Sequence, residues 1–119
     1  MSHVATIKPT FHNIKAIQSA CARIPGIDFC GKGFVSFYDE TEVGGYILQL
    51  QGWKYPVVIK PDGSLSYDNY NGEWGNEALL DRFKQVYAIE AAKCEAIEQH
   101  YEYTEEVLPT GVLKLTINV

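Results

Sequence analysis

Cysteine is scarce in this chain, and its arrangement excludes a disulfide framework. The three cysteines, Cys21, Cys30 and Cys94, stand far apart and form no CxxC pair. An odd number of widely spaced thiols is typical of a protein from a reducing compartment, where disulfides do not persist. We therefore expect three free thiols and a cytoplasmic location.

Long apolar runs and clusters of basic residues are also missing. No run of apolar residues approaches the length of a transmembrane helix, and the first nine residues lack the charged start and apolar core of a signal peptide. The ten Lys and Arg residues are scattered and outnumbered by fifteen Asp and Glu residues, which gives a net charge of −5. Nucleic-acid binding depends on concentrated positive charge. The sequence thus predicts neither a membrane nor a nucleic-acid partner.

What the chain does contain is the composition of an ordinary globular domain. Hydrophobic residues make up 46% of its 119 residues and aromatic residues 13%, and both kinds are spread along the whole length. No linker, internal repeat or low-complexity tract divides the sequence. These values are typical of one folded domain, and we predict a single domain over residues 1–119.

Two segments have the apolar spacing of amphipathic helices. The first follows Asn13, a good N-cap residue, and ends at Pro25-Gly26. The second follows Asn76 and extends to about His100, with an apolar stripe that we expect to include Leu80, Phe83, Tyr87, Ala91, Cys94, Leu79, Val86 and Ile97.

The remaining segments alternate with a period of two and predict strands. They comprise an opening strand over residues 3–9, a meander over residues 27–67 and a closing hairpin over residues 101–119. Gly31-Lys32-Gly33 indicates a bulge or turn. The element order is β-α-β-β-β-β-α-β-β. We therefore predict an α+β fold: a mostly antiparallel sheet of six or seven strands, with two helices packed on one face.

Candidate catalytic and metal-binding groups do not form recognised patterns. The histidines, His3, His12 and His100, stand at no metal-ligand spacing with one another or with the cysteines. Gly31-Lys32-Gly33 lacks the longer glycine pattern of a phosphate-binding loop. Acid–base catalysis needs a carboxylate whose environment shifts its pKa. The acidic clusters of this chain instead lie in polar segments: Asp39, Glu40, Glu42, Glu102, Glu105 and Glu106. We predict no catalytic residue, metal or cofactor, and favour a non-enzymatic role.

The segment from Tyr67 to Trp74 is the strongest candidate contact site. It combines the rings of Tyr67, Tyr70 and Trp74 with polar groups such as Glu73, and Trp53 is a further candidate anchor in a nearby turn. Such a mixture suits stacking on the ring of a small ligand or anchoring a partner protein. The alternative is that these rings cover the open face or the edges of the sheet.

Four stretches resemble a family of hypothetical reading frames from plastids, cyanobacteria and phages, the domain of unknown function 1257 family. They are residues 1–8 (MSHVATIK), residues 63–67 (GSLSY) with the following Trp74-Gly75, residues 80–89 (LDRFKQVYAI) and residues 110–116 (TGVLKLT). The resemblance covers nearly the whole chain and is weakest over residues 25–60. At residues 71–74 (NGEW) this sequence departs from the family, which has an acidic residue followed by paired tryptophans.

The resemblance implies an adaptor or accessory role, because some family members are encoded near AAA-type ATPases. It also implies a plastid stroma or a phage-infected host cytoplasm as alternative locations. Our leading hypothesis is an adaptor with a protein partner. The alternatives are a small-ligand binder for a nucleotide or sugar that uses residues 67–75, and, last, a weak hydrolase or transferase. A free sheet face or edge would also allow self-association.

Overall fold

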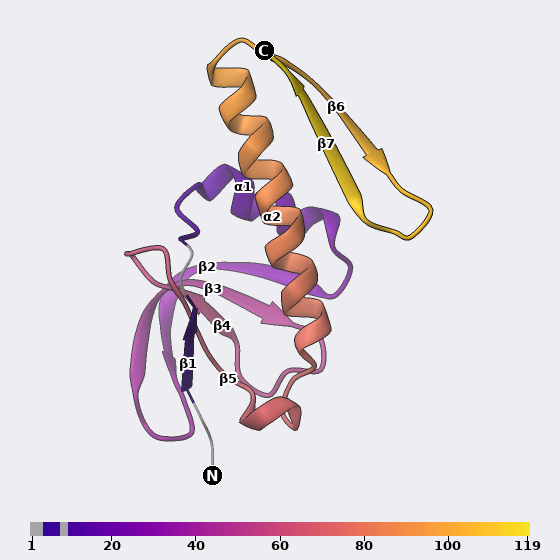
Figure 1. The fold of residues 1–119 in the computed structure, drawn as a ribbon. Helices are drawn as coiled ribbons and strands as arrows, with labels where there is room; N and C mark the ends of the chain where they lie inside the picture. Colours follow the sequence, from indigo (N-terminus) through magenta and orange to yellow (C-terminus); the bar gives the residue numbers. More distant parts are fainter. Residues whose placement is uncertain (1–3, 8–9) are drawn as a thin grey trace.

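The computed structural model describes residues 4–7 and 10–119. Its elements occur in the predicted order, which confirms the α+β fold (Figure 1). They are β1 (Val4–Ile7), α1 (Ile14–Arg23), β2 (Ile27–Ser36), β3 (Glu42–Leu50), β4 (Val57–Ile59), β5 (Leu65–Asp68), the short 3₁₀ helix η1 (Tyr70–Gly72), α2 (Glu77–Glu98), β6 (Glu102–Val107) and β7 (Leu113–Asn118).

The strands form two separate sheets. Five strands pair in the order β1-β5-β4-β3-β2, and β6 pairs only with β7. All the pairings are antiparallel. Because β1 and β2 stand at the two ends of the order, they form the edges of the larger sheet. The register of β2 on β3 shifts between Phe29 and Lys32, so of the two features predicted at Gly31-Lys32-Gly33, a bulge or a turn, the structure has an irregularity of the bulge type within one continuous strand.

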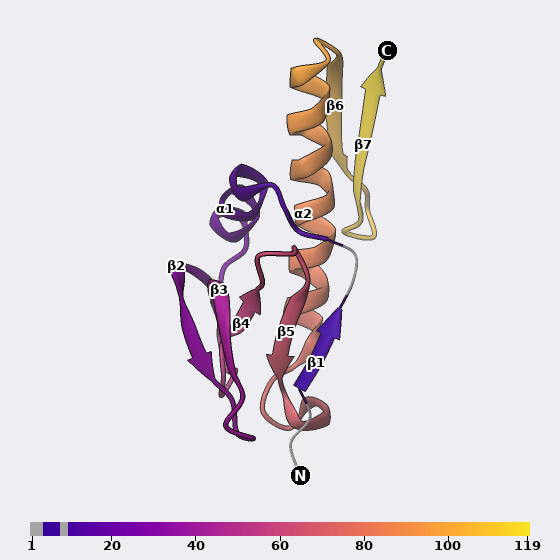
Figure 2. The same cartoon turned by 90° about the vertical axis from the view of Figure 1, so that its left-hand side faces the viewer.

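The expected single sheet of six or seven strands is therefore wrong. The 22 residues of α2 rise by about 1.5 Å each, which makes a rod of roughly 33 Å. Its first half lies over the larger sheet and its second half extends past it, so the closing hairpin begins beyond reach of any strand of that sheet (Figures 1 and 2). The hairpin packs against the projecting half of α2 instead.

Both helices begin at the asparagines predicted to cap them. The Asn13 side chain accepts a hydrogen bond from the Ala16 amide at 3.1 Å, and that of Asn76 accepts one from the Ala78 amide at 2.8 Å. These bonds satisfy backbone donors that a helix start otherwise leaves unpaired. No helix among the described residues is both long and apolar enough to cross a membrane.

The main core lies between the larger sheet and the two helices. Ile17 of α1, Leu80 and Phe83 of α2, and Leu48 and Leu65 of the sheet are all fully buried there. Both helices thus pack on one face, as predicted. A smaller cluster occupies the opposite face of the sheet and consists of Val35, Phe37 and Val58, with Val43, Ile47 and Tyr55 packed against it.

The apolar stripe of α2 differs from the prediction in its last turns. Ile97 is 60% exposed and Cys94 is half-buried, whereas Ala96 is buried. These turns no longer face the larger sheet, and their neighbours are the hairpin and the start of α1. Glu90, earlier on the same helix, is half-buried in an ion pair with Arg23.

An ion-pair network ties α1, α2 and β6 together. Arg23 contacts Glu90 at 2.9 Å and Glu105 at 2.8 Å, and Lys93 contacts Glu105 at 3.0 Å. The hydrogen bond from Arg23 lowers the pKa of Glu105, with partial opposition from burial and further help from Lys93. The network therefore joins the hairpin to both helices through one carboxylate.

We expect this carboxylate to make the free energy of unfolding depend on pH in the acidic range. The pKa of Glu105 is lower in the folded than in the unfolded chain, so its contribution is complete above about pH 4.3 and is lost as the pH falls through the folded value. Glu105→Gln should flatten the fall in unfolding free energy between about pH 5 and pH 3, by up to about 1 kcal/mol at low salt. Urea titrations across this range measure the effect. Glu106→Gln on the same strand is the control, and an equal flattening there would contradict the assignment.

Candidate functional site

Two of the five predicted contact residues lie in the core. Trp53 and Tyr67 are each only 6% exposed, and their rings meet edge to face with centroids 5.7 Å apart. The indole N–H of Trp53 donates to the carbonyl oxygen of Asn76 at 3.2 Å. Tyr67 belongs to strand β5 rather than to a loop. Both rings therefore brace the connection into α2 from inside.

The other three predicted residues lie together closer to the surface. The ring of Tyr70 stacks on that of Trp74 with centroids 4.8 Å apart and an angle of 24° between their planes. The backbone of Trp74 is fixed on both sides, because its N–H donates to Asn69 at 2.9 Å and its carbonyl accepts from the Lys54 amide at 2.8 Å. Glu73, which lies between Tyr70 and Trp74 in the sequence, is exposed.

The structure adds three residues that sequence reasoning missed, and together with Trp74 they form a cage. The rings of Tyr38, Tyr55 and Trp74 all lie within about 6 Å of the Lys54 ammonium, and we call these four residues the Trp74 cage. The Lys54 nitrogen lies 4.2 Å from the Trp74 ring centroid, 5.7 Å from that of Tyr55 and 6.0 Å from that of Tyr38. These are cation–π distances. The rings come from three separate connections, so no local pattern indicates the cage.

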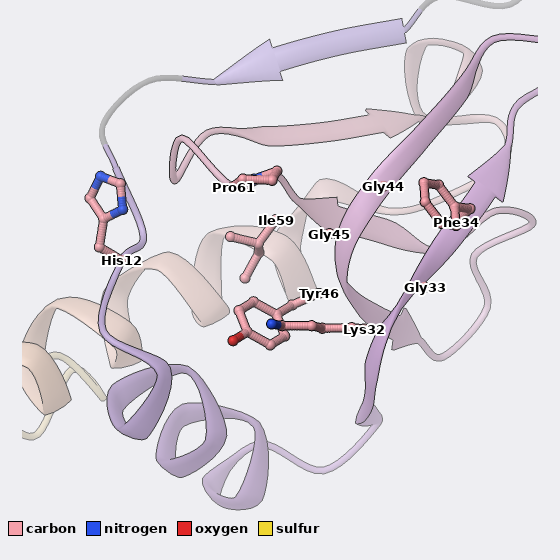
Figure 3. Close-up of a pocket in the computed structure, with 9 residues that line it drawn as sticks. All are labelled: His12, Lys32, Gly33, Phe34, Gly44, Gly45, Tyr46, Ile59 and Pro61. Atoms are coloured by element: carbon pink, nitrogen blue, oxygen red, sulfur yellow. The ribbon is translucent and has the colours of Figure 1, made fainter.

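A second feature is a hollow of about 760 Å³ that extends from the edge strand β2 across β3 to the end of β4 (Figure 3). We call it the edge hollow. It lies where β2 and β3 extend past the start of α1, with the Lys32 side chain across the Tyr46 ring at 5.6 Å and His12 on the opposite side. Its lining residues are His12, Lys32, Gly33, Phe34, Gly44, Gly45, Tyr46, Ile59 and Pro61.

Glycines shape the sheet wall of the edge hollow. Gly45 has a φ of 155°, and a Cβ there would overlap the backbone of Ile59 on β4. A Cβ on Gly44 would lie 2.6 Å from the ring of Phe34, its cross-strand partner, which covers Gly44 and is itself 76% exposed. The Gly44-Gly45 pair is the sequence signal that could have indicated this hollow. Glycine inside a strand marks a place where another backbone or a ligand approaches closely.

Among the described residues no cysteine lines either feature, and His12 is the histidine at the edge hollow. Burial, aided by Cys30 and Asp28, raises the pKa of the Cys21 thiol to about 11, so it stays protonated at neutral pH. Cys30 is exposed and Cys94 half-buried. Over residues 4–7 and 10–119 no three His, Cys, Asp or Glu side chains are placed to hold a metal ion. His3 lies outside the described residues.

One acidic side chain has an unusual environment. Asp68 at the end of β5 is fully buried, and neither of its carboxylate oxygens accepts a hydrogen bond from any part of the chain that the structure describes. By strand alternation it shares the face of Ser66, which pairs with Val58 of the smaller cluster. A buried polar group without a partner is costly to the fold, so such a group calls for a physical reason.

Comparison with known proteins adds no relative to this description. No protein-family model, curated protein or solved structure matches the chain. The resemblance to the plastid, cyanobacterial and phage reading frames thus stays a prediction, and any function has to be argued from the two features above.

Proposed function

We propose that this chain is a non-enzymatic adaptor that binds an extended segment of a partner protein along β2, with a side chain of that segment in the edge hollow. The observation that carries the proposal is Phe34: a large apolar ring, 76% exposed, on an edge strand and at the rim of a hollow. Exposed aromatic rings beside a depression are typical anchors of protein interfaces.

The sheet supports this proposal through its edge. β2 is ten residues long and, among the described residues, pairs only with β3. Its outer backbone groups are therefore open to an added strand, the mode of recognition known as β-augmentation. In that mode backbone hydrogen bonds supply affinity, and pockets for alternate side chains supply specificity. Lys32, Gly33 and Phe34 of β2 line the edge hollow, which we propose as such a pocket.

The partner class follows from the family resemblance alone. Some family members are encoded near AAA-type ATPases, so an ATPase subunit in the cytoplasm, or in the plastid stroma, is the partner that we propose. The acidic net charge of −5 favours a partner segment that carries basic residues beside its apolar anchor.

The adaptor proposal predicts that Phe34 is needed for partner capture. We expect Phe34→Ser to reduce recovery of the partner from a lysate of the native host at least tenfold, because an apolar anchor at an interface centre commonly contributes 2 kcal/mol or more, roughly thirtyfold. Quantitative mass spectrometry of the captured proteins measures the loss. Val107→Ser is the matched control, since Val107 is also largely exposed but lies on β6. Equal recovery of the partner with the wild-type protein, Phe34→Ser and Val107→Ser would contradict the proposal.

A small-ligand binder is the second candidate, and the stacking of Tyr70 on Trp74 near the surface favours it. Tyr70 and Trp74 are both only partly buried, and stacked rings of this kind accept the flat face of a base or sugar. A thermal-shift screen of nucleotides and sugars separates the two functions. A large shift with one compound supports the ligand binder, and no shift with any compound favours the adaptor.

A further inference from the structure

We propose that the Trp74 cage is a binding site for a methylated ammonium group, and that Lys54 occupies the site while no ligand is bound. The starting observation is that three rings approach one ammonium at centroid distances of 4.2 to 6.0 Å. This inference depends on the cage alone, which shares no residue with the edge hollow. A negative result for one of the two proposals therefore does not contradict the other.

The rings are positioned without help from the Lys54 side chain. Trp74 is held through its backbone by Asn69 and by the Lys54 amide, and its ring packs against Tyr38 at 5.3 Å and Tyr55 at 5.8 Å. Tyr55 also contacts Phe37 of the smaller cluster at 6.1 Å. Trp74 and Tyr55 therefore stay in place when the lysine ammonium leaves, which is the preorganisation that a binding site needs. Tyr38 is 58% exposed and completes the cage by packing on the Trp74 ring.

The chemistry of the occupant points to methylated ammonium. A lysine ammonium is compact and strongly hydrated, so entering a cage of rings costs it water. A methylated ammonium carries the same charge on a larger, less hydrated surface, and aromatic cages recognise such groups. Carboxylates flank the cage in sequence and attract a cation: Asp39 and Glu40 follow Tyr38, and Glu73 precedes Trp74. Lys54 is exposed and free to swing into water, so its displacement should weaken ligand binding only about two- to fivefold.

The test uses tetramethylammonium as the probe and the tryptophan indole N–H signals in NMR as the reading. The two tryptophans serve as site and reference, because Trp53 is buried and bonded to Asn76 whereas Trp74 lines the cage. We expect a saturable shift of the Trp74 signal alone. Lys54→Ala should tighten binding about two- to fivefold, and Trp74→Ala should weaken it at least tenfold, with Tyr55 ring signals as the reading in that variant.

Two controls distinguish a cation site from a merely apolar patch. The neutral isostere 3,3-dimethyl-1-butanol has the shape of choline without its charge, and it should not shift the Trp74 signal. Lys32→Ala removes a lysine that lies over one ring only, that of Tyr46, and should leave tetramethylammonium binding unchanged. Free choline and free trimethyllysine then show whether a headgroup or a side chain fits better. The proposal is overturned if Lys54→Ala gives no saturable shift, or if the isostere binds as well as the cation.

Discussion

Trp53→Ala should lower the free energy of unfolding by about 3–5 kcal/mol, the range measured when a large aromatic side chain is removed from a core. The ring is 6% exposed, packs edge to face on Tyr67 and donates a hydrogen bond to Asn76. It fits so closely that a Cβ on Gly75 would lie 2.6 Å from its Cε2 atom. The substitution leaves a cavity and removes the link between the β3–β4 connection and α2. Urea unfolding followed by circular dichroism measures the loss.

Trp74→Ala is the natural comparison for this experiment. Both tryptophans lie near the start of α2, but Trp74 is only partly buried and its indole is part of the cage. We expect its replacement to cost about 1 kcal/mol, because much of the ring already contacts water. Equal losses for the two variants would show that Trp53 is not the core residue described above.

The second large effect is expected at Gly45. Gly45→Ala places a Cβ against the Ile59 carbonyl, 2.8 Å from the Ile59 carbonyl carbon, and in a backbone conformation that alanine rarely adopts. Backbone atoms in a sheet cannot rotate away, so β3 and β4 must separate. Strain and overpacking together should cost more than about 2 kcal/mol. Thermal unfolding measures this cost, and the altered wall should also change the edge hollow.

The neighbouring glycine supplies the matched control. A Cβ on Gly44 meets only the ring of Phe34, an exposed side chain that is able to turn aside. We expect Gly44→Ala to cost less than about 1 kcal/mol. If Gly44→Ala proves as destabilising as Gly45→Ala, the backbone contact between β3 and β4 is not what requires glycine at residue 45.

The sequence predicts the local elements of this fold well because local chemistry decides them. Asn13 and Asn76 have side chains that cap helices, and Pro25-Gly26 ends the first helix. The bulge near Gly31 and the turn at residues 61–64 likewise follow from residue types. The number of strands in the larger sheet does not, since it depends on how far the long helix carries the chain before the hairpin begins.

The two candidate sites show the limit of sequence reasoning more sharply. All four rings lie in or near turns of the sequence, yet those of Trp53 and Tyr67 fill the core whereas those of Tyr70 and Trp74 lie near the surface. Only Tyr67 belongs to a strand, so the side that the other three rings face depends on how the connections pack against the start of α2. The Lys54 ammonium meets Tyr38 and Trp74 only after three connections fold together. The edge hollow depends in the same way on the pairing of Phe34 with Gly44.

The separation of the hairpin from the larger sheet has a consequence for local unfolding. A two-stranded hairpin is only marginally stable by itself, and β6 and β7 are held mainly by Leu113, which joins the main core, and by the Glu105 ion pairs. Opening of this hairpin leaves the buried residues between the larger sheet and the first half of α2 in place. We therefore expect the last nineteen residues to exchange their amide protons before the buried residues of the larger sheet, and to offer their strands to a second copy at a lower cost than those residues.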